Sequence, residues 1–90
     1  MIKIIGNDIW RDAEKVGWLE GNDVFGMDGR KQGFIRRNEI YSIDGRKLGY
    51  VENNKFNRPD GTFLPVAEMV KDVQGGAVSE LHRVAIKLLL

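Results

Sequence analysis

The chain has 90 residues, a formal net charge of +1 and no cysteine. This length predicts one domain over residues 1–90 with a small hydrophobic core. The near-neutral charge favours neither nucleic acid nor a membrane surface as a partner, and the lack of cysteine excludes disulfides and thiolate metal sites. Because the apolar runs stay far below the roughly 20 residues of a membrane span, we expect no membrane segment and a cytoplasmic protein.

The first predicted element is a short β-branched strand from Ile2 to Ile5. A turn motif then recurs every 16 residues, at Asp28-Gly29, Asp44-Gly45 and Asp60-Gly61, with a weaker copy at Asp12-Ala13. Asp-Gly is the preferred pair for a two-residue hairpin turn in which both central residues have positive φ. Each copy therefore predicts a β-hairpin. Alanine avoids positive φ, so the first turn is expected to be longer or of another type.

Three strand positions after each turn repeat as well. The first holds Gly17, Gly33, Gly49 and Pro65, and a glycine inside a strand usually marks the close approach of another backbone. The next two residues are apolar, as in Trp18-Leu19, Phe34-Ile35 and Tyr50-Val51. Neighbouring residues of a strand point to opposite faces, so these strands should be covered on both sides or lie where the sheet bends.

These patterns predict a mainly β fold made of four 16-residue β-hairpin repeats. The repeats run over about residues 9–24, 25–40, 41–56 and 57–70, and turn residues such as Asn22, Asn38 and Asn54 separate the hairpins. An isolated hairpin is marginally stable in water, so the four units must bury one another. A pseudo-four-fold meander, either closed or flower-like, would do so.

The period ends before the C-terminal segment, residues 71–90. Val78, Leu81 and Ala85 continue a helical apolar stripe, whereas Val84 and Ile86 begin an alternation that is typical of a strand. The early part of residues 77–90 favours a helix, so the segment is expected to be partly helical, and both structures stay open for the last five residues. This apolar tail could dock on the protein's own core, or on a second copy or another protein.

The repeated unit resembles a known family. It consists of an approach aromatic, Asp-Gly-Arg-Lys, a glycine and an aromatic–aliphatic pair, as in Phe25 to Ile35 and Tyr41 to Val51. This unit resembles that of the four-fold β-flower proteins, a bacterial family of four-hairpin proteins without a known function. The resemblance covers roughly residues 2–67. The first repeat departs from it at Ala13 and the fourth at Pro65. It implies four two-stranded petals around a pseudo-four-fold axis, and it implies no catalytic residue.

Five basic residues are the candidate binding site: Lys15, Arg30, Lys31, Arg46 and Lys47. If the hairpin tips point the same way, these side chains form a positive ring that could hold an anionic ligand. The alternative is that they keep exposed hairpins soluble and discourage edge pairing.

The aromatic column has two interpretations. Trp18, Phe34 and Tyr50 could belong to the core, or they could line a sugar- or choline-binding face. The column adds an aromatic component to the ligand-binding hypothesis above.

No enzyme motif is present in the sequence. The only histidine, His82, offers neither a metal cluster nor a catalytic triad, so we expect no enzyme, no metal and no cofactor. The sequence favours a non-catalytic structural or protein-interaction module. The alternative is a small-ligand or anion binder that uses the repeated Lys, Arg and aromatic residues.

Overall fold

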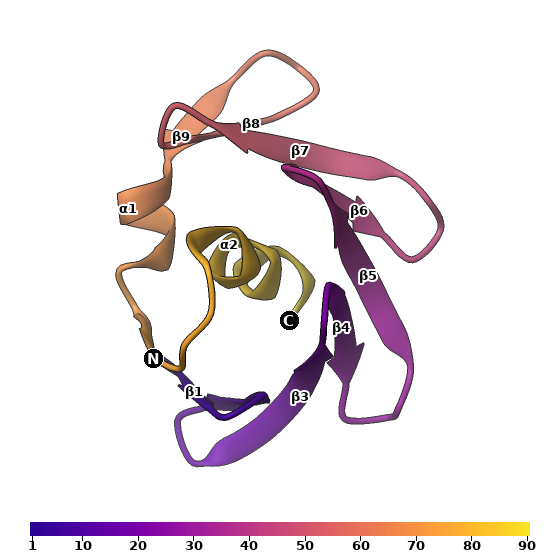
Figure 1. Cartoon of the computed structure of the whole chain (residues 1–90), viewed down its shortest axis with the longest axis vertical. Helices are drawn as coiled ribbons and strands as arrows, with labels where there is room; N and C mark the ends of the chain where they lie inside the picture. Colours follow the sequence, from indigo (N-terminus) through magenta and orange to yellow (C-terminus); the bar gives the residue numbers. More distant parts are fainter.

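The computed structural model describes residues 1–90 and confirms a mainly β protein. It contains one ten-stranded sheet and two short helices, α1 (Val66–Val70) and α2 (Glu80–Leu89). Figure 1 shows the sheet as an arc that bends around α2. The strands are β1 (Ile2–Ile5), β2 (Asp8–Arg11), β3 (Glu14–Glu20), β4 (Asp23–Gly26), β5 (Lys31–Arg36), β6 (Glu39–Ser42), β7 (Lys47–Glu52), β8 (Lys55–Asn57), β9 (Phe63–Pro65) and β10 (Val73–Gly75).

The sheet is an open meander. Its order is β10-β1-β2-β3-β4-β5-β6-β7-β8-β9, with β10 parallel to β1 and every other pair antiparallel. The edge strands β9 and β10 do not pair with each other, and α1 lies between them (Figure 1). Pro65 ends β9 and has no N–H to donate, so strand pairing stops there and the chain turns into α1.

The predicted two-residue geometry of the Asp-Gly turns is wrong. In the second hairpin the loop has three residues, Met27 to Gly29, because the Gly26 N–H donates to the Arg30 carbonyl. The Gly29 N–H bonds the Gly26 carbonyl, and within this loop only Gly29 has positive φ. This is a type I turn followed by a left-handed glycine. The loops at residues 43–45 and 59–61 have the same hydrogen bonds.

The first hairpin has a different type of turn, as the alanine at position 13 led us to expect. Its loop is shorter than the other three, whereas a longer loop was one of the two expectations. Arg11 pairs directly with Glu14, which leaves only Asp12 and Ala13 in the loop. The positive φ of 56° falls on Asp12, a residue type that tolerates this conformation, and Ala13 avoids it.

The glycines inside the strands mark close approaches between backbones, as predicted. A Cβ at Gly33 would lie 2.3 Å from the Tyr41 carbonyl oxygen and 2.8 Å from Leu89 of α2. A Cβ at Gly17 would lie 2.1 Å from the Phe25 carbonyl oxygen. Each of β3, β5 and β7 also has a β-bulge one residue before its glycine, and the unpaired residues are Val16, Gln32 and Leu48. The bulges and glycines together bend the sheet where α2 packs.

The expected C-terminal helix is confirmed, and it continues to Leu89. Ser79 caps α2 by accepting the His82 N–H at 3.2 Å. Val84, Ala85 and Ile86 have no exposed surface, so α2 forms the centre of the core on the concave side of the sheet. The apolar tail therefore docks on the protein's own core, which was one of the destinations that the sequence left open. Neither helix has the length and hydrophobicity required to cross a bilayer.

Arg83 of α2 holds the edge strand β10 in place. Its guanidinium donates to the carbonyl oxygens of Val73 at 3.1 Å, Gly75 at 2.7 Å and Gly76 at 3.3 Å. These carbonyls lie in or directly after β10, which has a partner strand only at β1. Charge-assisted hydrogen bonds therefore replace part of the pairing that a second strand would have supplied.

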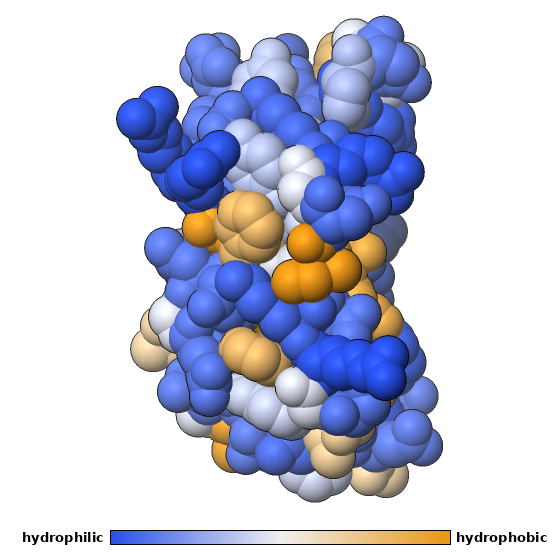
Figure 2. All heavy atoms as spheres, turned by 90° about the vertical axis from the view of Figure 1, so that its right-hand side faces the viewer, coloured by the Kyte–Doolittle hydropathy of each residue, from blue (hydrophilic) through white to orange (hydrophobic).

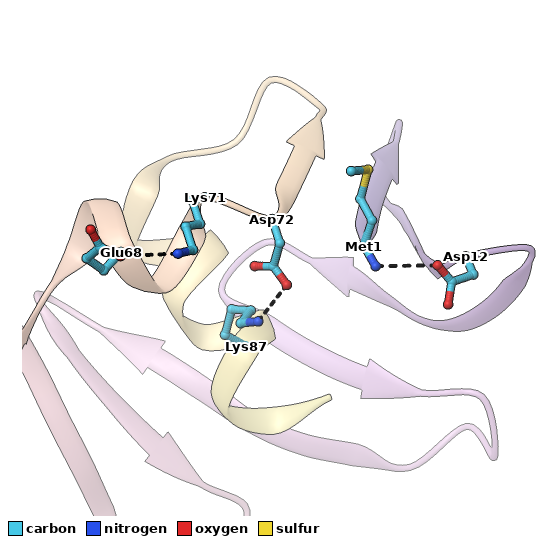
Figure 3. A network of polar contacts seen from close by, with 6 residues as sticks. All are labelled: Met1, Asp12, Glu68, Lys71, Asp72 and Lys87. Carbon is cyan, nitrogen blue, oxygen red and sulfur yellow. Dashed lines mark hydrogen bonds and ion pairs between the residues drawn. The ribbon is translucent and has the colours of Figure 1, made fainter.

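An ion pair joins α2 to the loop before β10. Lys87 Nζ lies 2.8 Å from Asp72 Oδ2, and Figure 3 shows this contact beside the Lys71–Glu68 and Met1–Asp12 pairs. The hydrogen bond from Lys87 lowers the pKa of Asp72 below its ordinary value. Asp72 therefore stabilises the fold above its unfolded-state pKa of about 3.9, and this contribution is lost as pH falls through the lower folded-state pKa.

We predict that Asp72→Asn makes unfolding less sensitive to acid. The free energy of unfolding of the natural protein should fall more steeply than that of the variant below about pH 4, because only the natural protein must protonate a paired Asp72 carboxylate. Urea denaturation of both proteins between pH 7 and pH 3 measures the difference. Parallel pH profiles would contradict the prediction.

Candidate functional site

The three predicted lysines lie on the convex face of the sheet, each against the aromatic ring three residues ahead. Each lysine also pairs with a carboxylate on the preceding strand, so its charge is already compensated. Figure 2 looks onto the side of β4 to β7 and shows a largely hydrophilic surface with small orange groups. The contacts are Lys15 with Trp18 (5.6 Å to the ring centroid) and Asp8 (3.0 Å), Lys31 with Phe34 (4.9 Å) and Asp23 (3.0 Å), and Lys47 with Tyr50 (5.1 Å) and Glu39 (2.6 Å).

The two predicted arginines lie elsewhere, at the hairpin tips. The Arg30 side chain is 86% exposed and lies 3.9 Å from the Asp28 carboxylate. Arg46 is exposed, and its backbone N–H donates to Asp44 at 3.2 Å. The five basic residues are thus divided between the convex face and the tips, and each of the five has an acidic neighbour.

The third hairpin has the most extended polar network of this face. The hydrogen bond from Lys47 lowers the pKa of Glu39, and Glu39 in turn raises the pKa of Lys47. The Tyr41 hydroxyl donates to Glu39 at 3.1 Å, and it accepts a hydrogen bond from Arg36 at 3.3 Å. The Tyr41 hydroxyl therefore links Arg36 to the Lys47–Glu39 ion pair.

The aromatic column is half-buried on the convex face, between the two predicted extremes of core and open binding face. Trp18 stacks on Phe25 of the next strand, with ring centroids 5.5 Å apart and planes at 3°. Phe34 stacks on Tyr41 in the same way, at 5.2 Å and 7°. Offset stacking of this kind stabilises neighbouring strands and covers one face of each ring.

Tyr50 breaks this series, because its cross-strand partner is Asn57. The Asn57 amide donates to the backbone carbonyls of Tyr50 and Lys55 rather than covering the ring. A hollow of about 400 Å³ lies beside Tyr50, lined by Lys47, Gly49, Tyr50, Arg58, Pro59 and Gly61. We take this hollow, the Tyr50 hollow, as the candidate site.

The sequence reading missed Arg58 and Asn57 as site residues. The signal lay in the approach strands, where Phe25 and Tyr41 stand 32 and 16 residues before a polar residue, Asn57. An aromatic position that turns polar in one repeat marks the place where one ring of a stacked pair is absent.

We predict that Asn57→Phe stabilises the protein. The new ring can stack on Tyr50 as Phe25 stacks on Trp18, which contributes about 0.5–1.5 kcal/mol beyond apolar burial. Thermal denaturation should show a higher melting temperature than that of Asn57→Leu, which adds apolar surface without a ring. An equal or lower melting temperature for Asn57→Phe would show that the hollow cannot take a ring.

A second, wider hollow of about 830 Å³ lies at the first hairpin tip. Its lining is Arg11, Asp12, Ala13, Glu14, Lys15, Val16 and Met27. Two carboxylates face two cations there, so the lining has no net preference for an anion or a cation.

His82 has a structural position. Its Nδ1 lies 2.7 Å from the Ser79 hydroxyl and its Nε2 lies 3.0 Å from the Gly21 carbonyl oxygen, which ties the start of α2 to the β3–β4 turn. The structure contains no group of three or more His, Asp or Glu side chains that could hold a metal ion.

Comparisons with protein-family models, curated proteins and solved structures found no match to this chain.

Proposed function

We propose that this protein is a non-catalytic protein-interaction module and that its hairpin tips are the contact surface. The supporting observation is the exposure of two large aliphatic side chains at equivalent positions of two tips. Met27 is 52% exposed and Ile43, 16 residues later, is 57% exposed. A single exposed apolar residue needs no explanation. An exposed apolar residue that recurs beside an arginine at two tips has the composition of a protein–protein interface.

The construction of the tips favours recognition. In each, the Asp carboxylate accepts the backbone N–H two residues ahead, at 2.9 Å for Asp28 and 3.2 Å for Asp44. The Ser42 hydroxyl also donates to Asp44 and lowers the pKa of that carboxyl. A loop that is already ordered loses little conformational entropy on binding. Two such tips on one protein would give a bivalent contact with a partner that offers apolar and acidic groups.

Site-specific photo-cross-linking tests this proposal. A photoreactive residue at 27 or 43 should cross-link the same partner in cells, whereas one at Ile5, which is 58% exposed in β1, should not. Met27→Ser with Ile43→Ser should abolish the cross-link made from position 30. Identical cross-links from positions 5, 27 and 43 would contradict the proposal.

We also propose that the hairpins are four related petals, as the β-flower resemblance implies. The 16-residue spacing of the bulged residues Val16, Gln32 and Leu48 supports this relation. We keep the bacterial origin of that family and a cytoplasmic location as parts of the same proposal, since a cysteine-free chain suits a reducing compartment.

A further inference from the structure

We propose that the Tyr50 hollow binds a small planar aromatic anion, with the aromatic ring on Tyr50 and the anionic group on Arg58. This inference goes beyond the interaction role of the tips and does not depend on it.

The first argument is the uncovered ring. The convex face contains two stacked pairs, Trp18–Phe25 and Phe34–Tyr41, and in both the second ring comes from the following strand. At Tyr50 that place is empty because Asn57 turns its amide to the backbone. The space beside Tyr50 is therefore flanked by a ring that has no stacking partner within the protein. Planar ligands stack well on such a ring.

The second argument is the charge at Arg58. The seven ion pairs of the protein do not include Arg58, although they include Lys47 on the other side of the hollow. The half-buried Arg58 side chain donates from Nη1 to the Thr62 hydroxyl at 2.9 Å, which orients the guanidinium. The nearby Asp60 carboxylate accepts the Thr62 N–H at 2.9 Å and the Thr62 hydroxyl at 2.6 Å. Arg58 thus keeps donors free for a carboxylate or phosphate.

The third argument is access. A Cβ at Gly61 would meet no atom within 4 Å, so the side of the hollow at the β8–β9 loop is open. Gly49 lines the hollow with backbone alone, and a Cβ at this position would point toward the buried Phe56 ring, 2.4 Å away. An opening lined by glycine admits a flat ligand edge-on.

The charges and the ring together select the ligand class. A bare anion would use Arg58 and leave the Tyr50 ring without a stacking partner, and a neutral aromatic would leave the free donors of Arg58 unused, since Lys47 is already paired with Glu39. A ring bearing one carboxylate or phosphate satisfies both, whether it is a free metabolite or a nucleotide.

NMR titration of the ¹⁵N-labelled protein tests the proposal, with phenyl phosphate, adenosine 5′-monophosphate, inorganic phosphate and phenol as probes. Phenyl phosphate or the nucleotide should cause saturable shifts at Tyr50, Arg58 and Gly61, at a Kd at least roughly tenfold below those of phosphate and phenol. The two aromatic anions distinguish a simple aryl ligand from a nucleotide. Inorganic phosphate binding as well as both, or shifts that map away from Tyr50, would overturn the proposal.

Three variants and a control make the assignment specific. Tyr50→Leu and Arg58→Gln should each raise the Kd by roughly tenfold, because each removes one of the two contacts. Asn57→Phe should abolish binding by filling the hollow, with its folding checked by thermal denaturation. Arg37→Asn, which removes an exposed arginine at a positive-φ position that asparagine tolerates, should leave the Kd unchanged. An equal effect of Arg37→Asn and Arg58→Gln would reduce the site to general charge attraction and overturn the proposal.

Discussion

Gly33→Ala is expected to destabilise the protein by about 3 kcal/mol or more, the largest effect we predict for adding one methyl group. The new Cβ would lie 2.3 Å from the Tyr41 carbonyl oxygen of the neighbouring strand and 2.8 Å from both methyl groups of Leu89. Relief requires β5 to separate from β6 or α2 to move away from the sheet. Urea denaturation followed by circular dichroism measures the loss.

Gly45→Ala is the matched control, because a Cβ at this hairpin tip would meet no atom within 4 Å. Its cost comes only from the backbone, since Gly45 has a φ of 88°, and should be about 1–2 kcal/mol. If Gly33→Ala costs no more than Gly45→Ala, the close approach of the strands and α2 at Gly33 is not present in solution.

Ile86→Ala should cost about 2–5 kcal/mol. Ile86 has no exposed surface and belongs to the core cluster between α2 and the concave side of the sheet. The truncation leaves a cavity that the bulged strands, held by their hairpins, cannot close. Because 1 kcal/mol shifts the melting temperature of a domain of this size by about 4–8 °C, the transition should fall by roughly 10 °C or more.

Leu88→Ala tests whether the effect depends on burial. Leu88 lies two residues further along α2 and is 36% exposed. Both substitutions replace an aliphatic residue by the best helix former, so they differ mainly in the apolar surface removed from the core. Leu88→Ala should cost less than about 1 kcal/mol, and similar costs at both positions would contradict the placement of α2.

The hairpins could be predicted from the sequence, but their loop geometry could not. Asp-Gly suits both a two-residue turn and a three-residue loop that ends in a left-handed glycine. The choice depends on where the strands pair: Phe25 lies opposite Lys31, with Gln32 bulged out beyond it. That register reflects the bend of the sheet around α2, which is a tertiary contact.

The C-terminal segment was ambiguous for a related reason. Three consecutive residues, Val84 to Ile86, are completely buried, so α2 is in contact around most of its circumference. Val84 and Ile86 widen the helical stripe that Leu81 and Ala85 form, and they also produce the alternation that is typical of a strand. Only the curved sheet around α2 resolves the ambiguity.

The candidate site was only partly predictable. The 16-residue spacing identified Lys47 and Tyr50 as repeated positions, and both line the Tyr50 hollow. The carboxylate that pairs with Lys47 could not be predicted, because Glu39 reaches it across a strand pair whose register is shifted by a bulge. Arg58 could not be predicted, because it belongs to the most divergent repeat and the equivalent positions of the other repeats hold no arginine.

The placement of α2 has a consequence for synthesis. Every strand of the sheet leaves the ribosome before the helix that fills its concave side. Ile9, which is fully buried in the finished protein, precedes Ile86 by 77 residues, and translation at about 5–20 residues per second takes several seconds to cover that distance. During this interval the nascent hairpins have no helix to pack on. Stable folding must therefore follow, rather than accompany, the translation of the sheet, and a ribosome that stalls before residue 80 would display an unfilled apolar surface to chaperones.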